Sequence, residues 1–74
     1  MKFVEWAEKH RLSDRQAGDL IGTSAETARR YRMALRIPEW PIMLRIYDVS
    51  KGRVTPNDFL KEHHHRIRLY AAAE

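Results

Sequence analysis

The chain has 74 residues, of which 43% are hydrophobic and 32% are charged, and its formal net charge is +4. A chain of this length folds as one domain around a small core, which leaves no room for a two-domain enzyme with an internal cleft. It contains no cysteine, so disulfide frameworks, thiolate zinc sites and cysteine nucleophiles are excluded. Because we find neither a long apolar run nor a signal-peptide pattern, we expect a cytosolic protein without a membrane-spanning segment.

A first helix is predicted near the start of the chain. Phe3, Trp6, Ala7 and His10 recur at the spacing that places side chains on one side of a helix. This pattern predicts a helix over residues 2–10. Trp6 is expected in the core, and His10 is expected at the helix end rather than in catalysis.

A second helix is predicted after Ser13. Ser13 and Gln16 have the spacing of a capping box, in which each side chain binds the backbone N–H of the other residue. Gly22 is expected to end the helix, because glycine readily adopts the conformation that terminates helices. Gly18 lies inside it, where glycine costs about 1 kcal/mol relative to alanine, so it marks either a close approach of the next helix or a neutral exposed site. The buried stripe is expected to comprise Ala17, Leu20 and Ile21.

A third helix is predicted after a single turn residue, Thr23. Ser24 is its expected cap. The helix is expected to end near Ile37, because Pro38 disfavours helical geometry in the residue before it. On a helical wheel the inner side comprises Ser24, Thr27, Ala28, Tyr31 and Leu35. The outer side comprises Ala25, Glu26, Arg29, Met33 and Arg36, with Arg30 and Arg32 on its flanks.

Two further helices complete the predicted fold. Pro41 fits the first turn of a fourth helix, and Thr55 and Pro56 fit the start of a fifth. The apolar stripe of the fourth helix is expected to comprise Ile42, Met43, Ile46 and Val49, with Trp40 also in the core. Residues 66–70 alternate polar and apolar side chains, which fits a short strand, although the same residues also fit a helix. We therefore predict an all-α bundle of about five helices, with a domain at residues 1–60 and a tail at 61–74.

The excess positive charge is concentrated in one segment. Residues 24–36 contain four arginines against one acid, Glu26, which gives +3 of the net +4. Arginine suits planar, bidentate recognition of phosphate or guanine better than lysine does. A helix, a tight turn and an arginine-rich helix together form a helix-turn-helix motif at residues 13–36. Nucleic-acid binding is the interpretation we favour, and the alternative is a solvated basic surface.

Residues 12–31 resemble the helix-turn-helix of the Cro/repressor-type (lambda repressor-like) family of phage and bacterial regulators. The pattern rests on the residues Ala17, Gly18, Ile21, Gly22, Ala28 and Tyr31. Residues 38–59 resemble the fourth and fifth helices of small Cro-like members, so the resemblance covers roughly residues 3–60 and leaves out the tail. It implies a dimeric, sequence-specific DNA-binding protein that regulates transcription, expected here as a repressor.

The resemblance also implies which side chains contact DNA. The family's base-reading positions correspond to Ser24, Ala25, Glu26 and Arg30, and Arg29 is a neighbour that reads a base or a phosphate. Glu26 has an alternative role in the helix dipole. The family often has glutamine at the start of the second helix, where it binds a phosphate, but Asp14 stands there in this chain. The expected phosphate contacts are therefore Ser13, Arg15 or Gln16, followed by Arg32, Arg36 and the backbone near Trp40.

Other functions receive little support from the sequence. Consecutive histidines, His63 to His65, point about 100° apart on a helix, so we expect no metal ion and no cofactor. No acid, base and nucleophile can be assembled from the pattern, and we expect no enzyme. No small-molecule effector is indicated.

Two functions therefore remain. The first is a homodimeric regulator bound to a two-fold operator, with Ile67, Leu69 and Tyr70 as candidate dimer residues. The second is a protein-interaction module, such as an antitoxin or an accessory factor for polymerase or recombinase, that uses residues 61–74 to hold its partner.

Overall fold

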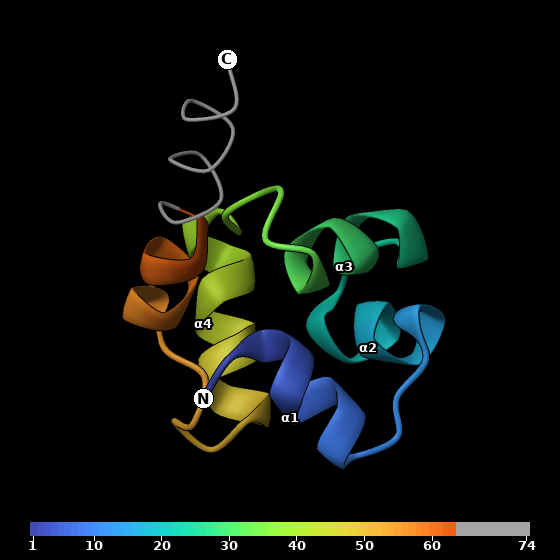
Figure 1. The fold of residues 1–74 in the computed structure, drawn as a ribbon. Coiled ribbons are helices and arrows are strands. Elements are labelled where there is room, and N and C mark those ends of the chain that lie inside the picture. The colour runs from blue at the N-terminus through green and yellow to red at the C-terminus, as the bar shows by residue number, and fades with distance from the viewer. Residues whose placement is uncertain (64–74) are drawn as a thin grey trace.

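A computed structural model of the protein describes residues 1–63, and within them the regular structure is entirely helical (Figure 1). The helices are α1 (Phe3–Lys9), α2 (Asp14–Ile21), α3 (Ala25–Arg32), α4 (Trp40–Val49) and a fifth at residues 56–63. The expected all-α fold of about five helices is confirmed. The fifth helix continues through the expected domain boundary at residue 60. The candidate strand or helix at 66–70, with Ile67, Leu69 and Tyr70, lies outside the described residues.

An aromatic cluster joins the two ends of the domain. The Phe3 ring lies 5.7 Å from that of Trp6 and 5.8 Å from that of Phe59, measured between ring centroids. Tyr31 packs edge-on against Phe59 at 6.3 Å. These distances are those of favourable aromatic pairs. α1, α3 and the fifth helix therefore share one core, and the expected burial of Trp6 and Tyr31 is confirmed. The largest fully buried side chains extend this core to α2, to α4 and to the segment before the fifth helix: Ile21, Ile46 and Val54.

Three apolar side chains that were expected inside the core lie at the surface. Trp40 is 65% exposed, Leu20 is 48% exposed and Leu35 is 45% exposed. Trp40 is the first residue of α4, so the core side of that helix begins only with the residues that follow. Leu35 lies outside because α3 has already ended before it. The helical wheel therefore does not apply to Leu35, which lies three residues beyond the end of α3.

α3 ends at Arg32 rather than near Ile37. Ala34 adopts a left-handed conformation with φ of 57°. The backbone N–H of Leu35 donates to the carbonyl of Arg30 at 3.0 Å, and that of Ala34 donates to Tyr31 at 3.2 Å. These two bonds form a Schellman motif, which glycine usually terminates. The expectation was wrong because alanine here takes the position where a glycine would have indicated the helix end.

The expected helix starts are confirmed. The Ser13 hydroxyl accepts from the Gln16 N–H at 3.1 Å, and Gln16 Oε1 accepts from the Ser13 N–H at 2.9 Å. At the fifth helix, Asp58 Oδ2 accepts from both the N–H and the hydroxyl of Thr55 at 2.9 Å. The N-terminal ammonium lies 3.2 Å from the same Asp58 oxygen.

Among residues 1–63, no helix combines the length and the apolar character needed to cross a membrane.

The Asp58 carboxylate makes the stability of this cap depend on pH. Burial alone raises the pKa of Asp58, but the hydrogen bonds from Thr55 and the N-terminal ammonium outweigh it, and the net pKa is lowered. A lowered pKa stabilises the fold above the carboxyl's ordinary pKa, and this contribution is lost as pH falls through the lowered value. We expect Asp58→Asn to cost about 1 kcal/mol at pH 7, with a smaller cost in acid. Urea unfolding from neutral to acid pH measures this.

Asp48→Asn is the matched control, because Asp48 is exposed and makes no ion pair or side-chain hydrogen bond with any residue from 1 to 63. It should leave stability nearly unchanged across the same pH range. A cost of Asp58→Asn that stays constant into strong acid would contradict the assigned role of the carboxylate.

Candidate nucleic-acid interface

α2 and α3 meet across a turn whose backbone conformation favours glycine. Gly22 has φ of 79°, the left-handed conformation that favours glycine. Gly18 is buried, and a Cβ atom on it would lie 2.7 Å from the Thr23 carbonyl oxygen and 2.9 Å from that of Ser24. Of the two interpretations of Gly18, the close approach of the next helix is the one that the structure supports. The close packing of α2 against the start of α3 therefore depends on the absence of a side chain at Gly18.

The turn holds α3 with one side in the core and the other in solvent. Ala28 and Tyr31 are 0% and 5% exposed. The Ser24 hydroxyl caps the helix by accepting from the Thr27 N–H at 3.1 Å. The five expected base-reading residues are all exposed: Ser24, Ala25, Glu26, Arg29 and Arg30. The outer side of α3 therefore carries Ala25, Glu26, Arg29 and Arg30, and Ser24, which the helical wheel placed on the inner side, is exposed as the cap just before the helix.

Glu26 lies beside the arginines of this side. Its carboxylate is 3.5 Å from the Arg30 guanidinium and 3.9 Å from that of Arg29, and all three side chains are about half exposed or more. Exposed ion pairs of this kind contribute about 0–1 kcal/mol and exchange readily with other partners. Both arginines therefore remain available to a ligand. Glu26 also lies in the first turn of α3, where its charge favours the helix dipole.

Arg32 has an internal partner. Its guanidinium donates to Asp14 Oδ1 at 2.9 Å and to the Leu12 carbonyl at 3.3 Å, and its side chain is 21% exposed. This pair ties the end of α3 to the start of α2, so Arg32 would have to leave Asp14 to bind a phosphate, and its phosphate contact stays a prediction. The same bond gives Asp14 a structural partner in this protein.

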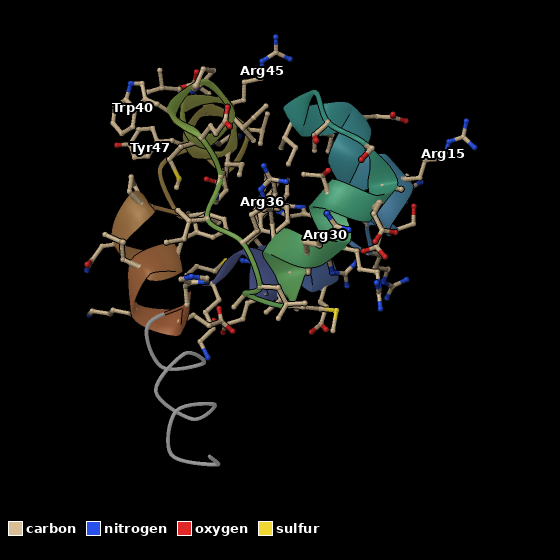
Figure 2. All side chains as sticks on the ribbon, turned by 90° about the horizontal axis from the view of Figure 1, so that it is seen from above. Arg15, Arg30, Arg36, Trp40, Arg45 and Tyr47 are labelled. Atoms are coloured by element: carbon tan, nitrogen blue, oxygen red, sulfur yellow. The ribbon has the colours of Figure 1, made fainter. Side chains whose placement is uncertain are left out.

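The remaining phosphate candidates surround α3. Ser13, Arg15 and Gln16 are exposed at the start of α2, where Ser13 and Gln16 are engaged in the capping box. Arg36 is exposed in the segment after α3. Figure 2 shows Arg30 and Arg36 on the face seen from above, with Arg15 extending outward at one side. Cations from α2, α3 and the following segment therefore gather around one helix.

Arg36 also influences the buried phenol of α3. Burial raises the pKa of Tyr31, the positive charge of Arg36 lowers it, and Glu39 raises it further. The net shift is upward, so the Tyr31 phenol is neutral at physiological pH. The ring therefore acts as an uncharged anchor for the inner side of α3.

One arginine near the turn was missed by the sequence interpretation. Arg45 is exposed on α4, and its guanidinium Nη1 lies 2.5 Å from the position that a Cβ atom on Gly22 would take. In the sequence, residues 37–60 contain three basic and three acidic residues, so this segment has no net charge and Arg45 did not stand out. Spatial position rather than composition brings Arg45 to the helix-turn-helix.

An apolar groove lies away from these cations. Its volume is about 240 Å³, and it is lined by Trp40, Met43, Leu44, Tyr47 and Pro56. Trp40, Leu44 and Tyr47 are each about half exposed or more. Figure 2 shows Trp40 and Tyr47 on the side of the molecule opposite Arg15. The surface thus has two distinct regions, one cationic around α3 and one apolar on α4.

Comparisons with protein-family models, with curated proteins and with solved structures give no match. Within residues 1–63, no group of three or more His, Asp or Glu side chains is placed to hold a metal ion. His63 Nδ1 lies 3.0 Å from the Ala34 carbonyl oxygen, which joins the fifth helix to the end of α3. His64 and His65 lie outside the described residues.

Proposed function

We propose that this protein is a sequence-specific, double-stranded DNA-binding regulator of transcription that acts as a repressor. The observation that carries the proposal is the orientation of α3. Its arginines face solvent, with Arg29 55% and Arg30 48% exposed, while Ala28 and Tyr31 hold its other side in the core. A buried or fully neutralised arginine side would have left the charge concentration without a role.

The dimensions of α3 suit the major groove. A helix with its side chains is about 10–12 Å across, and the groove of B-DNA is about 12 Å wide. Residues at the start of the helix, Ser24 to Glu26, would face base edges. Arg30 would pair with guanine O6 and N7, Glu26 would accept from a cytosine amine, and Ala25 would contact a thymine methyl group.

We further propose that the protein acts as a homodimer in the bacterial cytosol, encoded by the bacterium or by a phage. One module of this size reaches only a few base pairs, so a second copy supplies the remaining specificity. The two half-sites would lie about 10 base pairs apart, which is one turn of the duplex. Ile67, Leu69 and Tyr70 stay predictions for the dimer contact.

Selection from a pool of random duplexes tests this function. We expect enrichment of a two-fold symmetric sequence whose half-sites are about one helical turn apart. Gel shifts with the selected duplex and with a shuffled duplex, at several salt concentrations, then measure specificity. Equal binding to all sequences at every salt concentration would refute sequence-specific regulation.

The apolar groove favours a second candidate function, a protein-interaction module. Exposed apolar surfaces of this kind mark protein contacts in many small domains, and Trp40 at 65% exposure is an unusual surface residue. In this alternative, the groove together with residues 61–74 would hold a partner protein. The resulting complex would bind DNA weakly at physiological salt.

A matched pair of substitutions tests the second candidate. Leu44 in the groove and Leu20 on α2 are 47% and 48% exposed, so glutamine removes a similar apolar area at both positions. If the groove holds a protein, Leu44→Gln should weaken binding of the co-purified partner about ten-fold, as for loss of a central contact, and Leu20→Gln should not. Equal effects of the two variants on partner affinity, measured by calorimetry, would contradict a role for the groove.

A further inference from the structure

We infer that Arg45 is a DNA phosphate-binding residue that extends the interface from α3 onto α4. The inference rests on the proposed function and adds a residue that neither the charge pattern nor the family resemblance indicated. It starts from the position of the Arg45 guanidinium at the turn between α2 and α3.

Gly22 makes room for this guanidinium. The Arg45 Nη1 atom lies 2.5 Å, and its Cζ atom 3.2 Å, from the position of a Cβ atom on Gly22. The left-handed backbone favours glycine at this position, and the Arg45 side chain occupies the space beside it. Ser24, the cap of α3, follows two residues later, so Arg45 lies next to the end of α3 assigned to base reading.

Arg45 differs from the arginines at the end of α3. Arg29 and Arg30 have Glu26 nearby, and Arg32 is bound to Asp14. Within residues 1–63, Arg45 makes neither an ion pair nor a side-chain hydrogen bond, and it is exposed. A DNA phosphate could therefore bind the Arg45 guanidinium without breaking an ion pair within residues 1–63.

The direction of Arg45 complements that of Arg15. Figure 2 shows Arg15 extending outward from α2 at the right of the view and Arg45 extending outward from α4 at its upper edge. The major groove is bordered by one phosphate backbone on each side. With α3 in the groove, Arg15 would bind the backbone on the α2 side, and Arg45 would bind the backbone on the α4 side, beside the start of α3.

Arg45→Ala measures the contact against a matched control, Arg53→Ala. Both arginines are exposed, but Arg53 lies near the N-terminus, where its carbonyl accepts from the ammonium of Met1 at 2.9 Å. Loss of one phosphate contact lowers the slope of log K against log salt by about 0.9, or about eight-fold in affinity at 0.1 M salt. We expect this loss for Arg45→Ala on the selected duplex and on a random duplex alike, with much of it restored in Arg45→Lys.

Methylphosphonate substitution locates the contact. A neutral phosphate beside the half-site, on the α4 side, should weaken the binding of the wild-type protein and have no further effect on Arg45→Ala. Equal affinities and salt slopes of the Arg45→Ala and Arg53→Ala variants would overturn the inference. The random duplex also reports the salt slope. If the wild-type protein shows no sequence preference but Arg45→Ala still has a lower slope than Arg53→Ala, only the proposed function is refuted.

Discussion

Gly18→Ala is expected to destabilise the protein by about 1–3 kcal/mol, the usual cost of overpacking a tight contact. At an ordinary helix position the same change would stabilise by about 1 kcal/mol, because alanine is the better helix former. Here the new methyl group would lie 2.7 Å from the Thr23 carbonyl oxygen and 2.9 Å from that of Ser24. Both atoms belong to the backbone of the turn, so α2 and α3 must separate. Urea unfolding gives the free energy of unfolding directly.

The sign of the change in the free energy of unfolding distinguishes a close helix contact at Gly18 from an ordinary helix position. Asp19→Ala is the control in the same helix, since Asp19 is exposed and the change should alter stability by no more than about 0.5 kcal/mol. A small domain is stable by only about 0.05–0.15 kcal/mol per residue, so Gly18→Ala would remove a substantial fraction of the total. If Gly18→Ala proves more stable than the wild-type protein, the close packing of α2 on α3 is incorrect.

Arg30→Ala is expected to cost about 1–3 kcal/mol in discrimination between the selected duplex and a shuffled one. The reason is that a bidentate arginine–guanine pair reads one base, so its loss relaxes specificity at that position. The folding stability should be nearly unchanged, because the side chain is 48% exposed and its nearest acid, Glu26, is 3.5 Å away on the surface. Gel shifts of the protein with both duplexes measure the ratio of affinities.

Arg36→Ala provides the contrasting variant. As a phosphate contact it should weaken binding to the selected and the shuffled duplex equally and reduce the salt slope by about 0.9. The two variants thus separate base reading from electrostatic attachment. Identical losses for Arg30→Ala and Arg36→Ala on both duplexes would assign Arg30 to a phosphate and leave base recognition to other residues.

Local patterns in the sequence predicted the helices well where the determining residues are close together. The capping box of Ser13 and Gln16, the serine cap at Ser24 and the cap and proline at Thr55 and Pro56 all lie at helix starts in the structure. Each of these depends on bonds between residues at most three positions apart. Neighbouring side chains alone determine such contacts, so no tertiary information was needed.

The end of α3 could not be predicted, because the residue that terminates the helix is not a glycine. A helix usually stops where glycine takes the left-handed conformation, but Arg11, Ala34 and Lys51 take it in this protein. An ordinary side chain there costs about 1–2 kcal/mol, which the surrounding structure must offset. The sequence contains no indication of that compensation, and the placement of Leu35 inside the core was wrong as a result.

The amino-acid sequence by itself determined the all-helical fold, the position of the turn at Gly22 and the outward direction of Arg29 and Arg30. These follow from periodicity and capping, which act over one or two helical turns. Only the tertiary structure decided that Arg32 binds Asp14, that Arg45 reaches the turn and that Trp40 is exposed. Those outcomes depend on how separate helices pack, which brings together residues far apart in the chain.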